Sequence, residues 1–359
     1  MLTAGDYRRL LELVYISEGG AVVLGRNISA DGHADKPVRV VTHAHIDHLK
    51  GLEESIRFSK TIVGTAVTLD LVEALNYVGR DLLPYYRLKR KPIGLNECMS
   101  IEGDRMCLLP ASHIPGSAQV YVEHEGFKLG YTGDFKLGEG TVVMKGLDAL
   151  VIEATYGNPK HRRPFKDVVP EMLAYLVEEG LARFRRVYIY GYHGKLQEAM
   201  LILRERGVEA PFVLPRKIFN ATRLLEKHGF KIGNYVSEET GSSMGEGVVV
   251  FKHMNTAEYR RLDGGSLHIV LSGWEFNEPF RRVDDYTYLI ALSDHADFDD
   301  LVKYVEAGDP GLVVVDASRD GDAWSLRDAL VDKGYCAIVM PSGRVAEQLG
   351  ECMGGLMKP

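Results

Sequence analysis

Three histidines and one aspartate stand within six residues, in the segment from His43 to His48. His43 and His45 alternate with an alanine, and Asp47 and His48 follow at once. Imidazole nitrogens and carboxylate oxygens suit zinc, manganese and iron. The spacing predicts that the two alternating histidines face one metal ion and that Asp47 and His48 face a second. A polar loop of surface histidines is the alternative to such a hydrolytic centre.

Two later segments could complete a two-metal centre. His113 follows an expected strand at residues 106–110, and Asp134 follows another at 127–131. A lone histidine or aspartate at a strand end is usually a structural or surface residue. Two metal ions, however, need more than four ligands, one of which can be a bridging carboxylate. We expect Asp134 to be that bridge.

The elements that must hold these residues change character along the chain. Residues 4–15 and 68–78 favour helices. Apolar runs that favour strands lie at 21–24, 38–42, 61–63, 106–110, 118–123, 127–131 and 149–153. From 168 to 228 helices and strands alternate, which is typical of a parallel sheet, and a last alternation runs from 288 to 340. We therefore expect an α/β fold in two parts.

Bulk properties narrow the setting. The 359 residues carry a formal net charge of −7 at pH 7. The N-terminus resembles no signal peptide and no apolar run reaches transmembrane length, so we expect a cytoplasmic protein without a membrane partner. The four cysteines form no CxxC pair, which favours reduced thiols over disulfides. An acidic total does not point to nucleic acid, although a local basic patch would suffice to bind it.

The motif order resembles that of the metallo-β-lactamase superfamily. The His43–His48 segment comes first, then His113, then Gly133 and Asp134. Asp31 resembles the superfamily's first acidic residue, which supports the metal-binding loop without binding metal. The resemblance implies the αββα sandwich of that superfamily, with the metal ions at one edge of its two sheets.

A narrower resemblance is to the β-CASP nucleases. Residues 152–157 (Ile-Glu-Ala-Thr-Tyr-Gly) and 292–297 (Leu-Ser-Asp-His-Ala-Asp) are similar to the acidic and histidine motifs of that family. The resemblance implies an inserted α/β cap domain. We expect the metallo-β-lactamase domain at residues 1–160 and 288–359 and the β-CASP cap at 161–287. The motifs look closer to the RNA-processing and ligase-associated groups than to the Artemis group.

The resemblance also implies a role for each motif residue. The implied metal ligands are His43, His45 and His113 for one ion, Asp47 and His48 for the other, and Asp134 for both. The ions would be zinc, with manganese as the alternative. His295 would protonate the leaving oxygen and Glu153 would orient it, because a carboxylate favours the imidazolium form. Alternatively, His295 has only a structural role beside Asp294, at the cap of the following helix.

One position departs from the family pattern. RNA-cleaving members usually carry a further histidine after the next strand, whereas here residues 311–315 lead to Asp316. Asp316 could supply an oxygen ligand, which would favour a harder ion at the second site. It could equally be an ordinary strand-end residue, and the second site would then be weak.

Three residues are candidates for substrate binding. Lys195 follows a Gly-containing turn at the start of an expected helix, where free amides can hold a phosphate. Arg162 lies in the basic run 160–163, although such runs are usually solvated faces. Ser117 closes the segment 113–117, whose sequence His-Ile-Pro-Gly-Ser is also in the β-CASP style.

The β-CASP resemblance implies a metal-dependent nuclease that hydrolyses phosphodiester bonds, first of all in RNA, as in mRNA 3′-end processing. Its partner would be single-stranded RNA or DNA, and a homodimer is one option. The main alternative is a DNA exonuclease of DNA repair. A third is a small-molecule metallo-hydrolase, against which Glu153 and His295 argue. A fourth is a non-catalytic scaffold: the six candidate ligands argue against it, whereas the altered position at Asp316 keeps it open.

Overall fold

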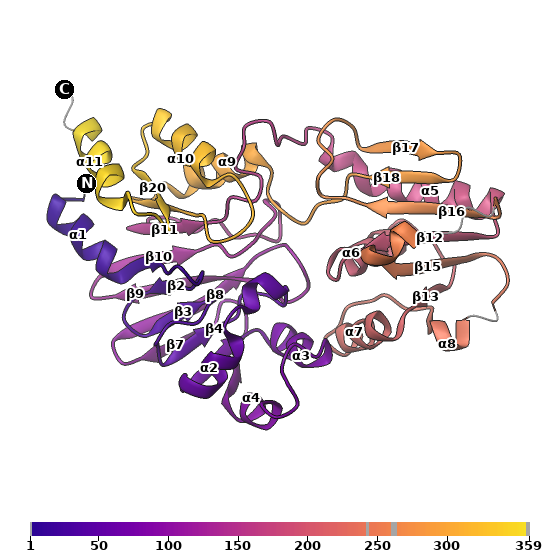
Figure 1. Cartoon of the computed structure of the whole chain (residues 1–359), viewed down its shortest axis with the longest axis horizontal. Coiled ribbons are helices and arrows are strands. Elements are labelled where there is room, and N and C mark those ends of the chain that lie inside the picture. The colour runs from indigo at the N-terminus through magenta and orange to yellow at the C-terminus, as the bar shows by residue number, and fades with distance from the viewer. Residues whose placement is uncertain (1, 242–243, 260–263, 357–359) are drawn as a thin grey trace. The chain divides into compact units, whose positions relative to one another are not determined.

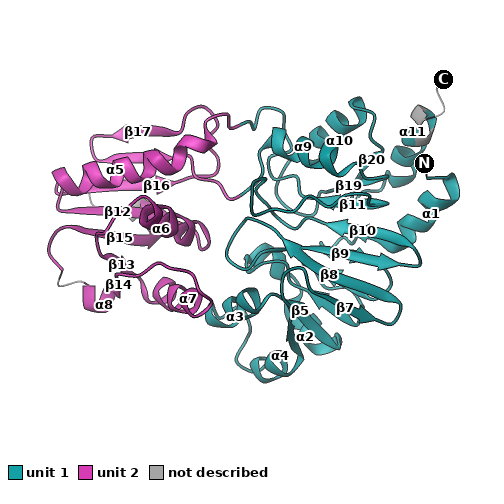
Figure 2. Cartoon of the chain, turned by 180° about the vertical axis from the view of Figure 1, so that it is seen from behind, with its two compact units in different colours: residues 1–162, 295–359 teal, residues 163–294 magenta. Residues whose placement is uncertain are grey.

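The computed structural model describes residues 2–241, 244–259 and 264–356. It divides into unit 1, residues 1–162 and 295–359, and unit 2, residues 163–294, as Figure 2 shows. The second boundary falls later than residue 288, where the sequence analysis placed it. The reason is that strand β18 (Thr287–Ile290) pairs with β16 (Ser266–Leu271) and so belongs to the sheet of unit 2.

Unit 1 contains two β-sheets (Figure 1). The first has the order β1 (Val14–Ile16), β2 (Val22–Leu24), β3 (Ile28–Ala30), β4 (Val38–Val40), β5 (Thr61–Gly64) and β6 (Arg90–Pro92). The second has the order β20 (Ala337–Met340), β19 (Val313–Asp316), β11 (Ala149–Ile152), β10 (Phe127–Tyr131), β9 (Ala118–His124), β8 (Asp104–Pro110) and β7 (Cys98–Ile101). Strands β10, β11, β19 and β20 are parallel, so their carboxyl ends share one edge.

Alternation along the strands explains the layers of unit 1. Val40 of the first sheet and Val122 of the second lie in one buried cluster between the sheets. Ile152 and Val315 point to the other face, where they pack against α9 (Phe298–Gly308) and α10 (Ala323–Asp332). Helices α2 (Leu52–Phe58), α3 (Ala66–Ala74) and α4 (Leu83–Lys89) contact β5. The predicted αββα sandwich is thereby confirmed.

Unit 2 is a seven-stranded sheet with helices. Its order is β14 (Tyr235–Ser237), β13 (Phe212–Leu214), β15 (Val248–His253), β12 (Arg186–Gly191), β16, β18 and β17 (Phe280–Asp284). Among the described strand pairs of this sheet, β17 with β18 alone is antiparallel, so the predicted parallel sheet is present. Side chains of α5 (Val169–Arg183), α6 (Lys195–Glu205) and α7 (Arg216–Lys227) share its core. Within the described ranges, no helix has the length and hydrophobicity that crossing a lipid bilayer demands.

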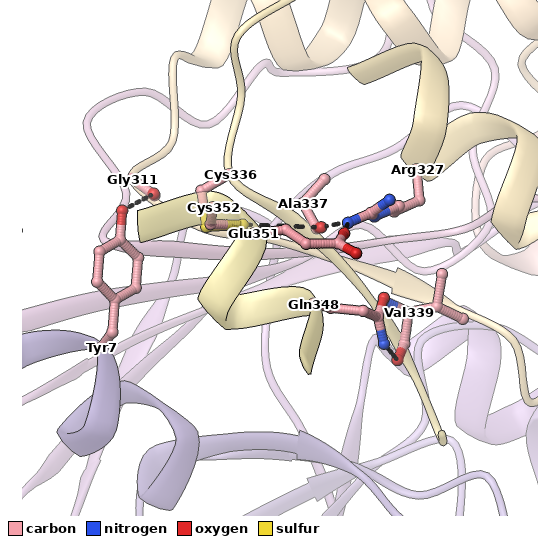
Figure 3. Close-up of a disulfide and its surroundings, with 9 residues drawn as sticks. All are labelled: Tyr7, Gly311, Arg327, Cys336, Ala337, Val339, Gln348, Glu351 and Cys352. Atoms are coloured by element: carbon pink, nitrogen blue, oxygen red, sulfur yellow. Dashed lines mark hydrogen bonds and ion pairs between the residues drawn. A yellow bond between two sulfur atoms is a disulfide. The ribbon is translucent and has the colours of Figure 1, made fainter. Parts of the chain in front are cut away.

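The four cysteines form two disulfides, so the expectation of reduced thiols is wrong. Cys98 and Cys107 are partners across β7 and β8. Cys336, just before β20, is bonded to Cys352 of α11 (Val345–Leu356), as Figure 3 shows. The Gln348 side chain reinforces this attachment, since its Oε1 accepts the N–H of Val339 at 2.7 Å. Helix α11 is therefore cross-linked to the edge of the second sheet, beside β20.

Replacing Cys352 with serine is expected to loosen α11. The disulfide closes a loop with a sequence separation of 16, and a loop of this length contributes about 3 kcal/mol in the chain-entropy treatment. Hydrogen exchange of the α11 amides under non-reducing conditions measures the change directly. Cys98→Ser is the matched control, because its disulfide joins only β7 to β8. Equal α11 protection in wild type and Cys352→Ser would contradict the prediction.

Candidate metal centre

The motif residues of the candidate centre lie in unit 1, on loops that follow the carboxyl ends of its strands. β4 leads to the His43–His48 segment, β8 to His113, β10 to Asp134 and β11 to Glu153. Parallel strands bring their carboxyl ends to one edge, which is where open α/β sheets hold ligands. His295 joins them as the first residue of unit 1 after the insertion.

A glycine fixes the loop that carries His113. Gly116 has φ of +93°, and a Cβ there would lie 2.8 Å from the backbone nitrogen of Thr68. The Gly116 carbonyl accepts hydrogen bonds from the hydroxyls of Thr65 (2.6 Å) and Thr68 (2.8 Å). Only glycine permits this close approach to the start of α3 without strain. The loop is thereby anchored to the start of α3.

Four residues form the first ligand group: His43, His45, His113 and Asp134. Each offers one ligand atom, and these atoms lie within 4.8 Å of one another. His45 Nδ1 is 3.1 Å from His113 Nε2. Asp134 Oδ2 is 3.7 Å from His43 Nε2 and 3.9 Å from His113 Nε2. This cluster has the number and the types of ligand that a zinc-like ion takes.

Asp47, His48 and Asp134 form the second ligand group. The short 3-10 helix η1 (Ile46–Leu49) carries the first two residues. His48 Nε2 is 3.0 Å from Asp134 Oδ2 and 3.4 Å from Asp47 Oδ2. Asp134 thus belongs to both groups, and its predicted role as a bridging carboxylate stays a prediction.

The charges and hydrogen bonds of the centre fit a divalent cation. His43 Nε2 and His48 Nε2 are buried and make no well-directed hydrogen bond, although both face the carboxylate of Asp134. A cation in each ligand group would satisfy these nitrogens and the carboxylate that the groups share. Burial and the neighbouring histidines hold the pKa of His43 well below its ordinary value, so its ring is neutral as a metal ligand must be. Burial opposes ionisation of Asp134, but His48 holds its pKa well below the ordinary value.

A second layer of groups orients His48. Asp31 Oδ2 is 2.8 Å from His48 Nδ1, which turns Nε2 toward Asp134. Asp31 also accepts the backbone N–H of Thr42 at 2.9 Å, and the buried guanidinium of Arg39 donates to the His48 carbonyl at 2.9 Å. Such partners fix the ring orientation of metal ligands. Arg39 and Thr42 were not predicted, although an arginine inside the apolar run 38–42 is a visible signal.

His295 and Glu153 form a pair beside the two ligand groups. His295 Nδ1 lies 3.2 Å from Glu153 Oε2, and Glu153 Oε1 accepts the backbone N–H of Phe135 at 2.9 Å. Burial raises the pKa of Glu153, and the charge of His295 partly offsets this effect. His295 Nδ1 is also 4.0 Å from Asp134 Oδ2. The pair is placed to hold a proton next to the ligands.

Asp316 and Ser117, two of the predicted site residues, form their hydrogen bonds outside the two ligand groups. The metal-binding groups found among the described residues do not include Asp316. Its carboxylate accepts the backbone N–H of Ser318 at 2.7 Å and pairs with Arg319 at 2.5 Å. Ser117 is buried, and its hydroxyl accepts the backbone N–H of Ile114 at 3.2 Å. Ser117 therefore shapes the His113 loop from within.

The two predicted basic contacts belong to different units. Arg162, in unit 1, donates from Nε to Asp299 at 2.9 Å and lies over the Phe298 ring. Lys195, in unit 2, lies 3.5 Å from Asp294 Oδ1 at the start of α6. Their role in binding a substrate stays a prediction.

Comparison with known proteins identifies the family. Residues 32–206 match the model of the β-lactamase superfamily domain. An uncharacterised protein in the lig 3′ region of Acidianus ambivalens is 41% identical over 133 residues, which are 36% of this chain and 94% of that protein. The probable RNase MJ4 of Methanocaldococcus jannaschii is 23% identical over 378 residues, with 84% of this chain and 86% of that protein covered. A probable DNA ligase of Opitutus terrae is 28% identical over 313 residues, 85% of this chain but only 29% of the ligase.

The chain belongs to the β-CASP nuclease family of the metallo-β-lactamase superfamily. This agrees with the resemblance found in the sequence. Members of the superfamily bind divalent metal ions, and the ligand groups around Asp134 are the candidate sites in this chain.

Proposed function

We propose that the chain is a metal-dependent nuclease that hydrolyses phosphodiester bonds in RNA. The observation that carries the proposal is the position of Asp134, shared by two groups of metal-type ligands and adjacent to the His295–Glu153 pair. A shared carboxylate suits two ions, and a nearby histidine–carboxylate pair suits protonation of a leaving oxygen. Zinc is the first candidate ion and manganese the second.

The residues of the chain divide the chemistry among them. When bound, divalent ions would supply Lewis acidity toward the phosphate and a water that ionises near neutral pH. Asp134 and the three histidines of the first group would hold one ion, and Asp134 with Asp47 and His48 would hold the other. Glu153 holds the His295 ring through Nδ1, so the ring can deliver a proton from Nε2 to the departing sugar oxygen.

The choice of RNA rests on the similarity to RNase MJ4, which spans most of both chains. Single-stranded DNA is the second candidate, favoured by the match between 85% of this chain and part of a probable DNA ligase. Because the chain spans only 29% of that ligase, the activity of the whole ligase is not carried over. The cytoplasmic location and the homodimer stay predictions.

The direct test compares 5′-labelled single-stranded RNA with DNA of the same sequence, in the presence of Zn²⁺ or Mn²⁺. We expect RNA to be cleaved, and the Asp47→Ala/His48→Ala double variant to be slower by about a thousandfold, because one ion's support of the transition state is worth several kcal/mol. The matched control is Glu53→Ala/Glu54→Ala, which changes two exposed residues of neighbouring helix α2. Cleavage of neither polymer would refute the nuclease proposal, and faster cleavage of DNA would favour the second candidate.

A further inference from the structure

Strand β19 ends at Asp316, at the same edge of the sheet as the loops that carry Asp134 and Glu153. A carboxylate at this place could complete the ligand set of the second group, which otherwise has only Asp47, His48 and Asp134. The Asp316 carboxylate instead binds groups of the loop that follows it. Oδ1 accepts the N–H of Ser318 at 2.7 Å and its hydroxyl at 2.6 Å, and Oδ2 pairs with Arg319.

Arg319 is a buried cation that joins three segments. Its Nη1 lies 2.5 Å from Asp316 Oδ2. Its Nη2 donates to the backbone carbonyls of Asp31 at 3.0 Å and Gly20 at 3.3 Å. Only 8% of the side chain is exposed, and Nε has no hydrogen-bond partner. The guanidinium geometry suits such a fixed multiple contact, which a lysine could not reproduce.

The charge of Arg319 reaches the second ligand group. Arg319 holds the backbone of Asp31, and the Asp31 side chain contacts His48 Nδ1 at 2.8 Å. Asp31 alone therefore stands between the Arg319 guanidinium and the His48 ring. A cation at this position also repels a metal ion held by Asp47, His48 and Asp134, because charges interact strongly where water is excluded.

We propose that Arg319 sets the metal affinity of the second ligand group, by withholding Asp316 from it and by placing a fixed positive charge beside it. The first group keeps four ligands, none of which depends on Asp316. This proposal rests on the metal binding in the proposed function. It makes Arg319 a positioning residue that tunes metal affinity without touching the substrate.

Titration of the metal-free full chain with Zn²⁺ alone, against a chelator of known affinity, tests this without any substrate. We expect two binding events of unequal affinity. Arg319→Gln should tighten the weaker one by about tenfold or more, because it removes a repelling charge and frees Asp316, and should leave the tighter one unchanged. Failure of the protein to cleave nucleic acid would not alter these binding constants, so the two proposals fail separately.

Two further variants keep the test decisive if Arg319→Gln folds poorly. Asp316→Asn leaves the guanidinium unbalanced and should weaken the second ion, and the double variant Asp316→Asn/Arg319→Gln should return it close to wild type. Arg327→Gln is the matched control, since it removes another largely buried, ion-paired arginine of unit 1 that lies outside the ligand groups. A merely structural role for Arg319 would weaken binding in both single variants. Weaker binding in both single variants would overturn the proposal. So would two Zn²⁺ ions bound with equal affinity by the wild type, or a weaker Zn²⁺ affinity that Arg319→Gln leaves unchanged.

Discussion

Replacing Asp134 with alanine is expected to abolish cleavage and to remove bound metal. Its Oδ2 atom lies within 4.0 Å of four histidine rings, and both ligand groups depend on it. Without this carboxylate, the buried rings would have to hold two divalent ions with one negative charge fewer. We expect cleavage to fall by at least about a thousandfold, the equivalent of several kcal/mol of transition-state stabilisation.

Metal content by atomic emission and cleavage rate should fall together in Asp134→Ala. Asp104→Ala is the matched control, because Asp104 is also buried and its Oδ1 lies 2.6 Å from His124 Nδ1. Asp104 begins β8, whereas the His113 loop follows the other end of that strand. The control variant should keep its metal even if it is less stable. Full metal content in Asp134→Ala would show that this residue is not a ligand.

Replacing His295 with alanine should slow cleavage by about 10² to 10⁴-fold, the usual contribution of a general acid, while metal content stays at the wild-type level. The reason is that the sugar oxygen would leave as an unprotonated alkoxide. Glu153→Gln should give a smaller loss, since it keeps the ring in place but no longer favours its charged form.

A substrate with a nitrophenolate leaving group separates proton donation from other roles. Nitrophenolate is stable as an anion and needs no proton, so His295→Ala should cleave bis(p-nitrophenyl) phosphate nearly as fast as wild type does. An equal loss on both substrates would argue against the proton-donor role. Loss of metal from His295→Ala would instead identify His295 as a ligand. Metal content should therefore be measured, because His295 Nδ1 lies 4.0 Å from Asp134 Oδ2.

The local motifs predicted much of the centre because strand periodicity fixes where strands end. His43, His113 and Asp134 each follow a buried strand, and these strands reach the same region of unit 1. Their clustering was therefore predictable, and the sandwich and the family were confirmed. Their individual roles stay predictions until they are tested by substitution.

Other features depend on contacts that spacing does not reveal. Arg319 meets Asp31 only after the chain has passed through unit 2, and no local pattern indicates that pair. Cys98 and Cys107 meet through the register of β7 with β8, which depends on a turn that we did not predict. Strands β15 and β16, which flank β12 in the sheet of unit 2, were not predicted. For β15 the sequence does contain a local signal, the apolar run Val-Val-Val-Phe at 248–251.

The point at which the chain returns to unit 1 has an evolutionary consequence. Unit 2 begins at Arg163 and ends at Asp294, and the next residue is His295. Every candidate ligand of the two metal groups is encoded before this segment, and the candidate proton donor immediately after it. Recombination among relatives could therefore exchange the whole insertion as one cassette, and the surface it presents to a polymer would change while the hydrolytic residues were inherited intact.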